Sequence, residues 1–255
     1  MEIVELNKHD NVYENESIFT SFNWKNIYDD KYHIFAVYDK NEIQAIFALY
    51  IHYKLGFKII TQAPFTPHCG LIFTKSNKNV HARNTLYKKI IQCIVDYIKY
   101  IKCSFVSLYF PTWIIDLQPF FWDDYKIITR YTYIIDFKDK LEEDILSNMN
   151  KKTRKYIIEG YLHGCEVKLC TDYKNIKKLF ELTFNKERLK YNNTIINNIL
   201  FNFTKYGNSF GFVTYMNEKP IKADFIIHDN ICAYAILSGK DDEYICKEAG
   251  PMTLY

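Results

Sequence analysis

The sequence has no apolar stretch long enough to cross a membrane and no secretory leader. None of its hydrophobic runs approaches the ~18 residues that a membrane-spanning helix requires. The N-terminus, MEIVELNKHDNVYENE, is acidic and lacks the basic start and apolar core of a signal peptide. These absences predict a cytoplasmic protein without a membrane span.

Recognisable cysteine, metal and nucleotide motifs are also missing. The seven cysteines include no C-x-x-C pair, and their odd number does not suggest a disulfide framework. We interpret them as free thiols packed as small hydrophobic side chains, and we expect no bound metal. The sequence also contains no G-x-x-x-x-G-K-[ST], G-x-S-x-G or H-E-x-x-H motif. Phosphate-loop, serine-hydrolase and zinc-protease chemistry is therefore not predicted.

The charge is nearly balanced, with 33 basic and 30 acidic residues and a formal net charge of +3. A nucleic-acid-binding domain is usually strongly basic, so the balance argues against nucleic acid as the main partner. At 255 residues and 48% hydrophobic content, the chain can bury a full core in one or two domains.

Two segments far apart in the chain each read as a β-hairpin. Both HIFAVYDKNEIQAIFALYI (residues 33–51) and SFGFVTYMNEKPIKADFIIH (residues 209–228) contain two β-rich apolar runs separated by a polar turn. Their central residues align, with one extra residue in the second turn. We therefore expect two halves built alike, residues 1–138 and 139–255.

Further elements follow from periodicity. The first half should contain strands at 55–62, 104–110 and 130–137, and an amphipathic helix at 84–101. The second half should open with a helix from Asp139, capped by Glu142 and ended by Gly164 in a left-handed turn. Its buried stripe should include these residues: Leu141, Ile145, Met149, Thr153 and Tyr156.

The rest of the second half is expected to be a strand at 165–169, helices within 175–207 and a strand ending at Leu237. Pro251 suits the first turn of a further helix, whose apolar face would begin with Leu254 and Tyr255. Compared with the first half, a helix and at least one strand are missing at the C-terminus. We therefore expect the second half to be truncated.

Four segments, in order, resemble the double-GNAT, Fem-like (FemAB-related) group of GNAT-family N-acetyltransferases. They are QAPFTPHCGLIF (62–73), PFFWDDYKIITRYTYIIDF (119–137), LSNMNKKTRKYIIEGYLHGCEV (146–167) and AYAILSGKDDEYICKEAGPMTLY (233–255). The cations between Lys151 and Lys155 thus belong to a family helix with a solvated face. The resemblance implies an α/β (α+β) protein with tandem GNAT-like folds, whose mixed central sheets are flanked by helices. Gly160 departs from the family, which more often has alanine there.

The resemblance also implies where an acyl donor would bind. In GNAT-type enzymes the pyrophosphate of acyl-CoA lies on backbone N–H groups at the start of a helix, which is a suitable anion site. The corresponding residues are Lys247, Glu248, Ala249, Gly250 and Met252. A plain helix cap is the alternative interpretation. The acidic loop 241–243 would repel a phosphate, so its carboxylates should turn away from any such site.

Acyl transfer in this family is direct attack of an amine or hydroxyl on a thioester, which requires an oriented acceptor and a base. Asp224 and His228 are four residues apart on one predicted strand and so share a face. Asp224 requires a partner if it is buried, whereas His228 is either a base or an exposed strand end. Tyr131, Tyr133 and Tyr234 are candidate leaving-group acids or packing residues.

Three functions remain open. The leading hypothesis is transfer of an acyl group, with acetyl as the first candidate, from acyl-CoA to an amine of a small molecule or cell-envelope precursor. A Fem-type aminoacyltransferase that uses aminoacyl-tRNA is the alternative, although no heptad run marks the coiled-coil insertion typical of those enzymes. A non-catalytic binding domain is the third.

Overall fold

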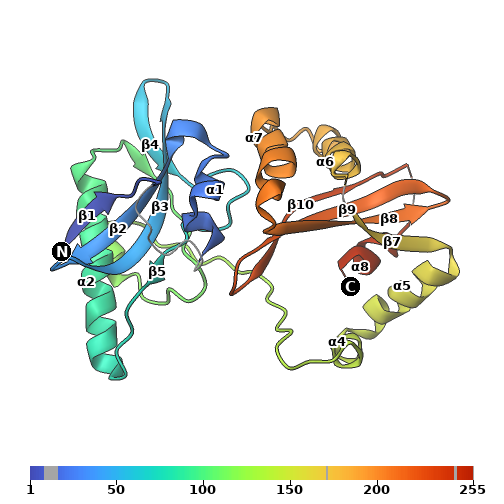
Figure 1. The fold of residues 1–255 in the computed structure, drawn as a ribbon, viewed down its shortest axis with the longest axis horizontal. Coiled ribbons are helices and arrows are strands. Elements are labelled where there is room, and N and C mark those ends of the chain that lie inside the picture. The colour runs from blue at the N-terminus through green and yellow to red at the C-terminus, as the bar shows by residue number, and fades with distance from the viewer. Residues whose placement is uncertain (9–16, 171, 244–245, 255) are drawn as a thin grey trace. The chain divides into compact units, whose positions relative to one another are not determined.

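The computed structural model describes residues 1–8, 17–170, 172–243 and 246–254. Two compact units form: residues 1–129 with 228–232, and residues 130–227 with 233–255. Each unit contains one β-sheet with helices on its faces (Figure 1). The predicted α+β class, with sheets flanked by helices, is confirmed.

The first unit is organised around sheet A. Its elements are β1 (Glu2–Glu5), η1 (Ile18–Thr20), α1 (Phe22–Lys25), η2 (Asp29–Lys31), β2 (Tyr32–Asp39), β3 (Glu42–Lys54), β4 (Phe57–Thr61), β5 (Ile72–Phe73), α2 (Val80–Tyr100), β6 (Phe105–Val106) and α3 (Gln118–Trp122). The strand order is β1-β2-β3-β4-β6, and β5 pairs with β3. The β4–β6 pair is parallel and the others are antiparallel, so sheet A is mixed.

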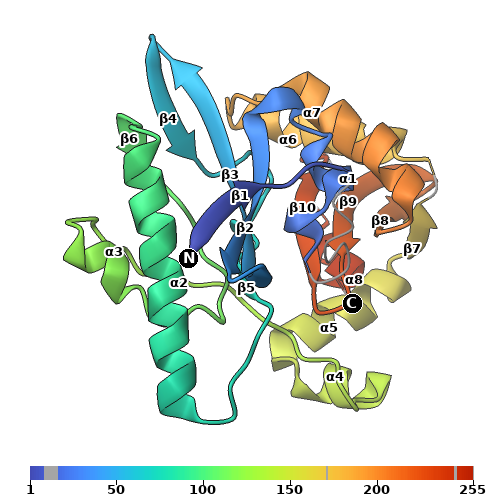
Figure 2. The same ribbon diagram turned by 60° about the vertical axis from the view of Figure 1, so that its left-hand side comes forward.

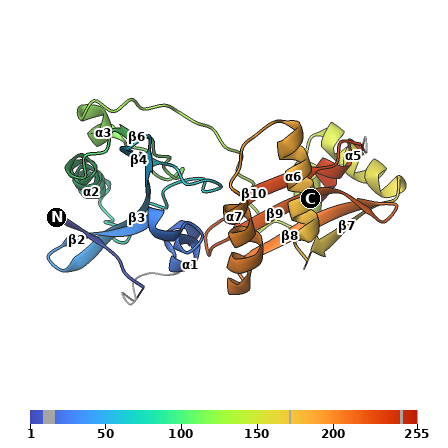
Figure 3. The ribbon, with the colours of Figure 1, turned by 90° about the horizontal axis from the view of Figure 1, so that it is seen from above.

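The amphipathic pattern of residues 84–101 does form a helix, α2, which covers one face of sheet A. Its buried residues Ile90, Ile94 and Ile98 pack with Phe35 and Phe47 of the sheet. Figure 3 shows α1 on the opposite face of the sheet. Burial of this apolar stripe is the main source of stability for such a helix.

The second unit is organised around sheet B. Its elements are α4 (Glu142–Asn148), α5 (Lys151–Leu162), β7 (Cys165–Cys170), α6 (Lys174–Lys186), α7 (Asn193–Asn197), η3 (Asn198–Asn202), η4 (Phe203–Tyr206), β8 (Ser209–Met216), β9 (Lys219–His228), β10 (Ala233–Lys240) and α8 (Ala249–Leu254). The strand order is β10-β9-β8-β7. Helices α6 and α7 lie on one face of this sheet, and α5 and α8 lie on the other (Figure 1).

The two predicted hairpins, β2–β3 and β8–β9, share their turn geometry. Lys40–Asn41 and Asn217–Glu218 are two-residue turns in which every residue has positive φ, the geometry that matches the twist of paired strands. The extra residue expected in the second turn is therefore wrong. Sequence similarity had placed a gap where the backbone has none.

A β-bulge also recurs at the same place in both hairpins. Gln44 is unpaired between the partners of Val37 and Tyr38, and Ile221 is unpaired between the partners of Thr214 and Tyr215. The two hairpins therefore superimpose residue for residue when counted from their turns. The similarity of the two halves extends to their irregularities.

The helix expected from Asp139 is shorter and is interrupted. Asp139 has a φ of 55° and lies before α4. The residue that precedes α4 is Leu141, and its N–H donates to the Asp144 carboxylate. At Met149 the backbone becomes extended, and Asn150 caps α5 by accepting from the Thr153 N–H at 2.8 Å. Of the predicted buried stripe, Thr153 and Tyr156 are half-buried on the same face as the buried Ile157 and Gly160, whereas Leu141 is exposed.

Gly160 has a packing role. A Cβ there would lie 2.0 Å from Met252 Sδ of α8, so glycine lets the two helices approach. The family departure at this position is thus matched by a methionine that fills the space. Gly164 ends α5 with a φ of +78°, as predicted.

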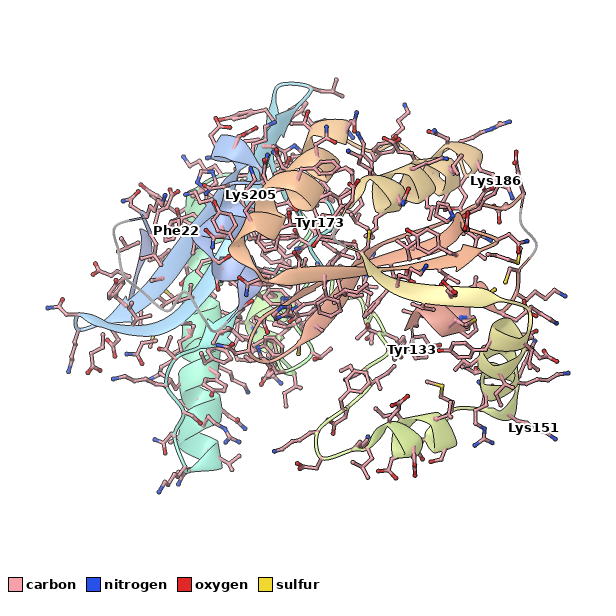
Figure 4. All side chains as sticks on the ribbon, turned by 45° about the vertical axis from the view of Figure 1, so that its right-hand side comes forward. Phe22, Tyr133, Lys151, Tyr173, Lys186 and Lys205 are labelled. Atoms are coloured by element: carbon pink, nitrogen blue, oxygen red, sulfur yellow. The ribbon has the colours of Figure 1, made fainter. Side chains whose placement is uncertain are left out.

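The strand expected at residues 130–137 does not form. This segment has no regular secondary structure and pairs with no described strand, and Tyr131 and Tyr133 are almost fully exposed; Figure 4 shows Tyr133. The strand expected at 104–110 is reduced to the two residues of β6. Alternating apolar residues predict a strand only where a partner strand is available.

Helix α8 begins at Ala249, so Pro251 is its third residue and lies in its first turn, as predicted. Tyr255 lies outside the described residues. No helix in the described part of the chain is long and apolar enough to cross a membrane.

His68 is a buried histidine whose titration should affect stability. It is 7% exposed, and its Nδ1 accepts from the Gly70 N–H at 3.1 Å. Burial lowers the pKa of His68 to about 4, and the charge of Asp229 opposes that shift only in part. The neighbouring Cys69 thiol is buried with a pKa raised by burial to about 12, so it is not an activated nucleophile.

Acid should therefore destabilise the first unit through His68. Between pH 6.5 and about 4 the unfolded chain binds a proton that the folded chain excludes, so stability is full above pH 6.5 and falls with pH. The expected loss is about 3 kcal/mol. Urea unfolding of the wild type and His68→Asn, which keeps an acceptor but cannot titrate, should show converging free energies as pH falls. Parallel pH profiles would contradict this assignment.

Candidate functional site

Two oppositely charged side chains lie together inside the second unit. Asp224 on β9 is 2% exposed, and Lys222, two residues earlier on the same face, donates from Nζ to Asp224 Oδ1 at 2.8 Å. The same ammonium group donates to Ser238 Oγ on β10. Burying two charges carries a desolvation cost that their attraction often fails to offset. Their presence in a core therefore calls for a reason beyond stability.

One carboxylate oxygen of Asp224 remains unused. Among the described residues, Asp224 Oδ2 is buried and accepts no hydrogen bond. Buried polar atoms are nearly always paired, because an unpaired one loses its hydration without compensation. Such an oxygen can accept an N–H or a proton from a bound molecule.

A short chain of hydroxyl groups joins the same face of the sheet to α8. Thr253 donates from Oγ1 to the Ala249 carbonyl at 2.6 Å. The Thr253 proton is used there, so Thr214 on β8 donates to Thr253 Oγ1, also at 2.6 Å. Thr214 is the β-sheet partner of Lys222. This chain connects the start of α8 to the strand position beside the charged pair.

The first half shows that the fold itself does not need charges here. Counted from the matching turns, Ala45 and Phe47 of β3 occupy the positions of Lys222 and Asp224 in β9. Both are buried in the apolar core under α2. Because the same architecture is satisfied by two apolar side chains, the charged pair of the second half is best explained by function.

The predicted catalytic residues are assigned to both units. Asp224 and Tyr234 belong to the second unit, whereas His228, at the end of β9, groups with the first. Tyr234 is half-buried on β10 and shares a strand face with Ser238, four residues later. Tyr131 and Tyr133 are exposed and lie on no strand. The hydrogen-bond partner of Asp224 is Lys222, and the catalytic roles of His228 and Tyr234 stay predictions.

The residues predicted to bind an acyl donor surround the start of α8. The Ala249 and Met252 side chains are buried against Cys165 and Ile221, so they contribute packing. The Glu248 carboxylate accepts from the Cys246 thiol at 3.4 Å, and its carbonyl accepts from the Met252 N–H at 3.1 Å.

The other two donor-site residues differ from these. A Cβ added at Gly250 would meet no atom within 4 Å, so its backbone has open space beside it. Lys247 lies in the loop just before the helix. Donor binding by this whole set stays a prediction.

The acidic loop has its own basic partners. Asp242 accepts from Lys186 of α6 at 2.6 Å and from Lys240 at 2.8 Å, and these bonds lower the pKa of Asp242. Figure 4 shows Lys186 on α6. The repulsion that this carboxylate would exert on a nearby phosphate is thus reduced.

Lys222, Ser238, Thr214 and Thr253 were not predicted as site residues. One signal was available, since Lys222 and Asp224 are opposite charges two residues apart within an apolar strand. The period of a strand places such residues on one face. Nothing local in the sequence indicates Ser238, which approaches only because β10 pairs with β9. Within the described ranges, no group of His, Cys, Asp and Glu side chains suits a metal ion.

Comparison with known proteins supports the fold. By sequence, no family model and no curated protein matches the chain. Among solved structures, FemX is similar over 100% of this chain and 84% of its own, with a TM-score of 0.64 and 12% identity. The C-terminal domain of a putative lysylphosphatidylglycerol synthetase from Agrobacterium fabrum is similar over 96% of this chain and 70% of its own, with a TM-score of 0.55 and 8% identity.

A conserved protein of unknown function from Bacteroides thetaiotaomicron VPI-5482 is similar over 93% of this chain and 75% of its own, with a TM-score of 0.51 and 14% identity. The likeness to FemX spans both units, so the resemblance that the four sequence segments indicated holds at the level of fold. The chain has the double-GNAT, Fem-like fold of FemX.

Proposed function

We propose that this protein is an acyltransferase that moves an acyl group, with acetyl as the first candidate, from acyl-CoA to an amine. The observation that carries the proposal is the buried Asp224, paired with the half-buried Lys222 and with an unused Oδ2, at positions where the first half is apolar. The Fem-like fold supports acyl transfer as the reaction class. A small molecule or a cell-envelope precursor would supply the amine.

Asp224 is proposed as the base. The acceptor nitrogen attacks the thioester carbon, forming a C–N bond and a tetrahedral oxyanion, and Asp224 Oδ2 takes the proton that the nitrogen loses. The C–S bond then breaks, and the CoA thiolate leaves and takes that proton from Asp224 Oδ2. Lys222 and Ser238 would hold the Asp224 carboxylate so that Oδ2 points toward the acceptor. Tyr234 and His228 are further candidates for proton transfer.

The start of α8 is proposed as the donor site. The open side of Gly250 would allow a phosphate to approach the backbone, and Lys247 precedes it. The Thr214–Thr253 chain would couple this helix to the strand that carries Lys222 and Asp224. Donor and base would then lie on the same face of sheet B.

Isothermal titration with acetyl-CoA, CoA and aminoacyl-tRNA tests the proposal. We expect saturable binding of acetyl-CoA, and transfer of its labelled acetyl group to at least one amine in a panel that includes amino sugars. Asp116→Asn, on the first unit, serves as the control for both measurements. Absence of binding to any acyl-CoA would overturn the donor assignment.

The second candidate is a Fem-type aminoacyltransferase. Two observations favour it: the likeness to FemX and the exposed cations Lys151 (Figure 4) and Lys152 on α5. Binding of aminoacyl-tRNA that persists at about 200 mM salt would support it, because non-specific phosphate contacts weaken steeply with salt. If neither donor binds, the non-catalytic alternative is favoured.

A further inference from the structure

The β3–β4 hairpin ends in exposed apolar side chains. Tyr53, Leu55 and Phe57 lie at its tip, and Phe105 of β6 lies beside β4; all four are exposed. Leu55, Phe57 and Phe105 line, together with Ile59, a shallow apolar groove on one face of the hairpin, and Tyr53 lies on the other face, opposite Lys58. The hairpin projects from the rest of the first unit (Figure 2). We define this surface as the hairpin patch.

Leu55 is poorly suited to its place in the fold. It has a φ of 52° and Gly56 a φ of 81°, so the turn is a two-residue type that favours Asn-Gly. Leucine in a left-handed conformation is strained, and Leu55 is 90% exposed, so it makes little packing contact. At the matching first position, the other two hairpin turns carry the polar residues Lys40 and Asn217. Leu55 therefore stabilises neither the turn nor the hydrophobic core.

Only positive charges accompany these apolar side chains. Lys54, Lys58 and Lys102 lie in the segments 50–62 and 100–108, which contain no Asp or Glu. Lys54 is the β-sheet partner of Phe57, and Lys58 is the partner of Tyr53. No salt bridge joins these lysines to another residue of the described chain. Each aromatic side chain of the tip therefore has an ammonium group beside it.

We propose that the hairpin patch docks on an anionic lipid bilayer. Aromatic and leucine side chains insert at the boundary between headgroups and acyl chains, while lysines bind anionic headgroups. Each lysine near such a surface strengthens binding about fivefold. A protein partner with an acidic groove would need a complementary shape, whereas a fluid bilayer accommodates a narrow projecting tip. The proposal is independent of the acyl-transfer reaction.

Vesicle sedimentation tests this proposal with the full chain. Wild-type protein should sediment with vesicles of mixed phosphatidylcholine and phosphatidylglycerol, and much less with phosphatidylcholine alone. Leu55→Asn should reduce binding at least fivefold while keeping or raising thermal stability, because Asn-Gly suits the turn. Replacing both Lys54 and Lys58 by Gln should reduce binding about 25-fold. Ile115→Asn, at another exposed apolar residue of the first unit, is the matched control and should bind as wild type.

Sedimentation of the same variants can also contradict the proposal. Equal sedimentation of wild type and Leu55→Asn, or no binding of wild type to anionic vesicles at low salt, would overturn the proposal. Light scattering tests whether a second copy of the chain occupies the hairpin patch instead. Self-association of the wild type that is lost in Leu55→Asn, without lipid binding, would show that it does and would overturn the proposal.

Discussion

Lys222→Ala is expected to lower the free energy of unfolding by about 3 to 5 kcal/mol, because it leaves the Asp224 carboxylate buried without its cation. Both side chains are inside the second unit, and Asp224 Oδ1 has Lys222 as its donor. Urea denaturation measures this loss. Lys54→Ala, at an exposed lysine of the first unit, should change stability by less than about 0.5 kcal/mol.

The double variant Lys222→Ala with Asp224→Phe should recover most of that loss. It copies Ala45 and Phe47, which fill the matching positions of the first half. It removes both charges and roughly conserves volume, a change that is often neutral or stabilising. The non-additivity of the two substitutions measures the coupling of the pair. A double variant less stable than Lys222→Ala would show that the two halves do not share this packing.

Activity should move in the opposite direction from stability. The double variant should fold but transfer no acyl group, since it lacks the proposed base. Asp224→Asn, which keeps an oxygen for Lys222, should reduce kcat by about 10² to 10⁴. Unchanged transfer by Asp224→Asn would exclude Asp224 as the base while leaving the acyl-CoA proposal open, because donor binding is measured separately.

Gly239→Ala should destabilise the second unit by about 3 kcal/mol. A Cβ at this position of β10 would lie 2.2 Å from the Phe180 nitrogen and 2.3 Å from the Leu179 carbonyl carbon, both in the backbone of α6. Backbone atoms cannot move aside like a side-chain end, so the helix must shift from the sheet. That shift would also loosen the buried contacts of Leu179 and Phe180.

Gly250→Ala is the matched control for this prediction. No atom lies within 4 Å of the added Cβ, and Gly250 is helical, so stability should be unchanged or rise by up to about 1 kcal/mol. Thermal unfolding of both variants compares them directly. A Gly239→Ala protein as stable as Gly250→Ala would mean that α6 and β10 are not in close contact.

Local pattern was a reliable guide where the structure depends on neighbours in sequence. Helix α2 followed from its apolar period, the hairpins followed from two β-rich runs around a polar turn, and Gly164 followed from its helix-ending role. The motif order also indicated the Fem-like fold. Pattern failed at residues 130–137, where a strand-like sequence has no partner strand in the described structure.

The candidate site depended on both kinds of information. Asp224 could be singled out from the sequence, because a charge within an apolar strand requires a partner. Its unused Oδ2, the approach of Ser238 and the equivalence with Phe47 became visible only once the strands were paired.

The physical reason for this difference is how far apart in the sequence the interacting residues lie. Hydrophobic period, turn chemistry and helix ends depend on residues a few positions apart, so they can be read along the chain. The contact of Gly239 with α6, the register that equates the two halves and the face shared with α8 join residues distant in sequence. Such contacts depend on strand pairing and helix packing, which require the whole fold.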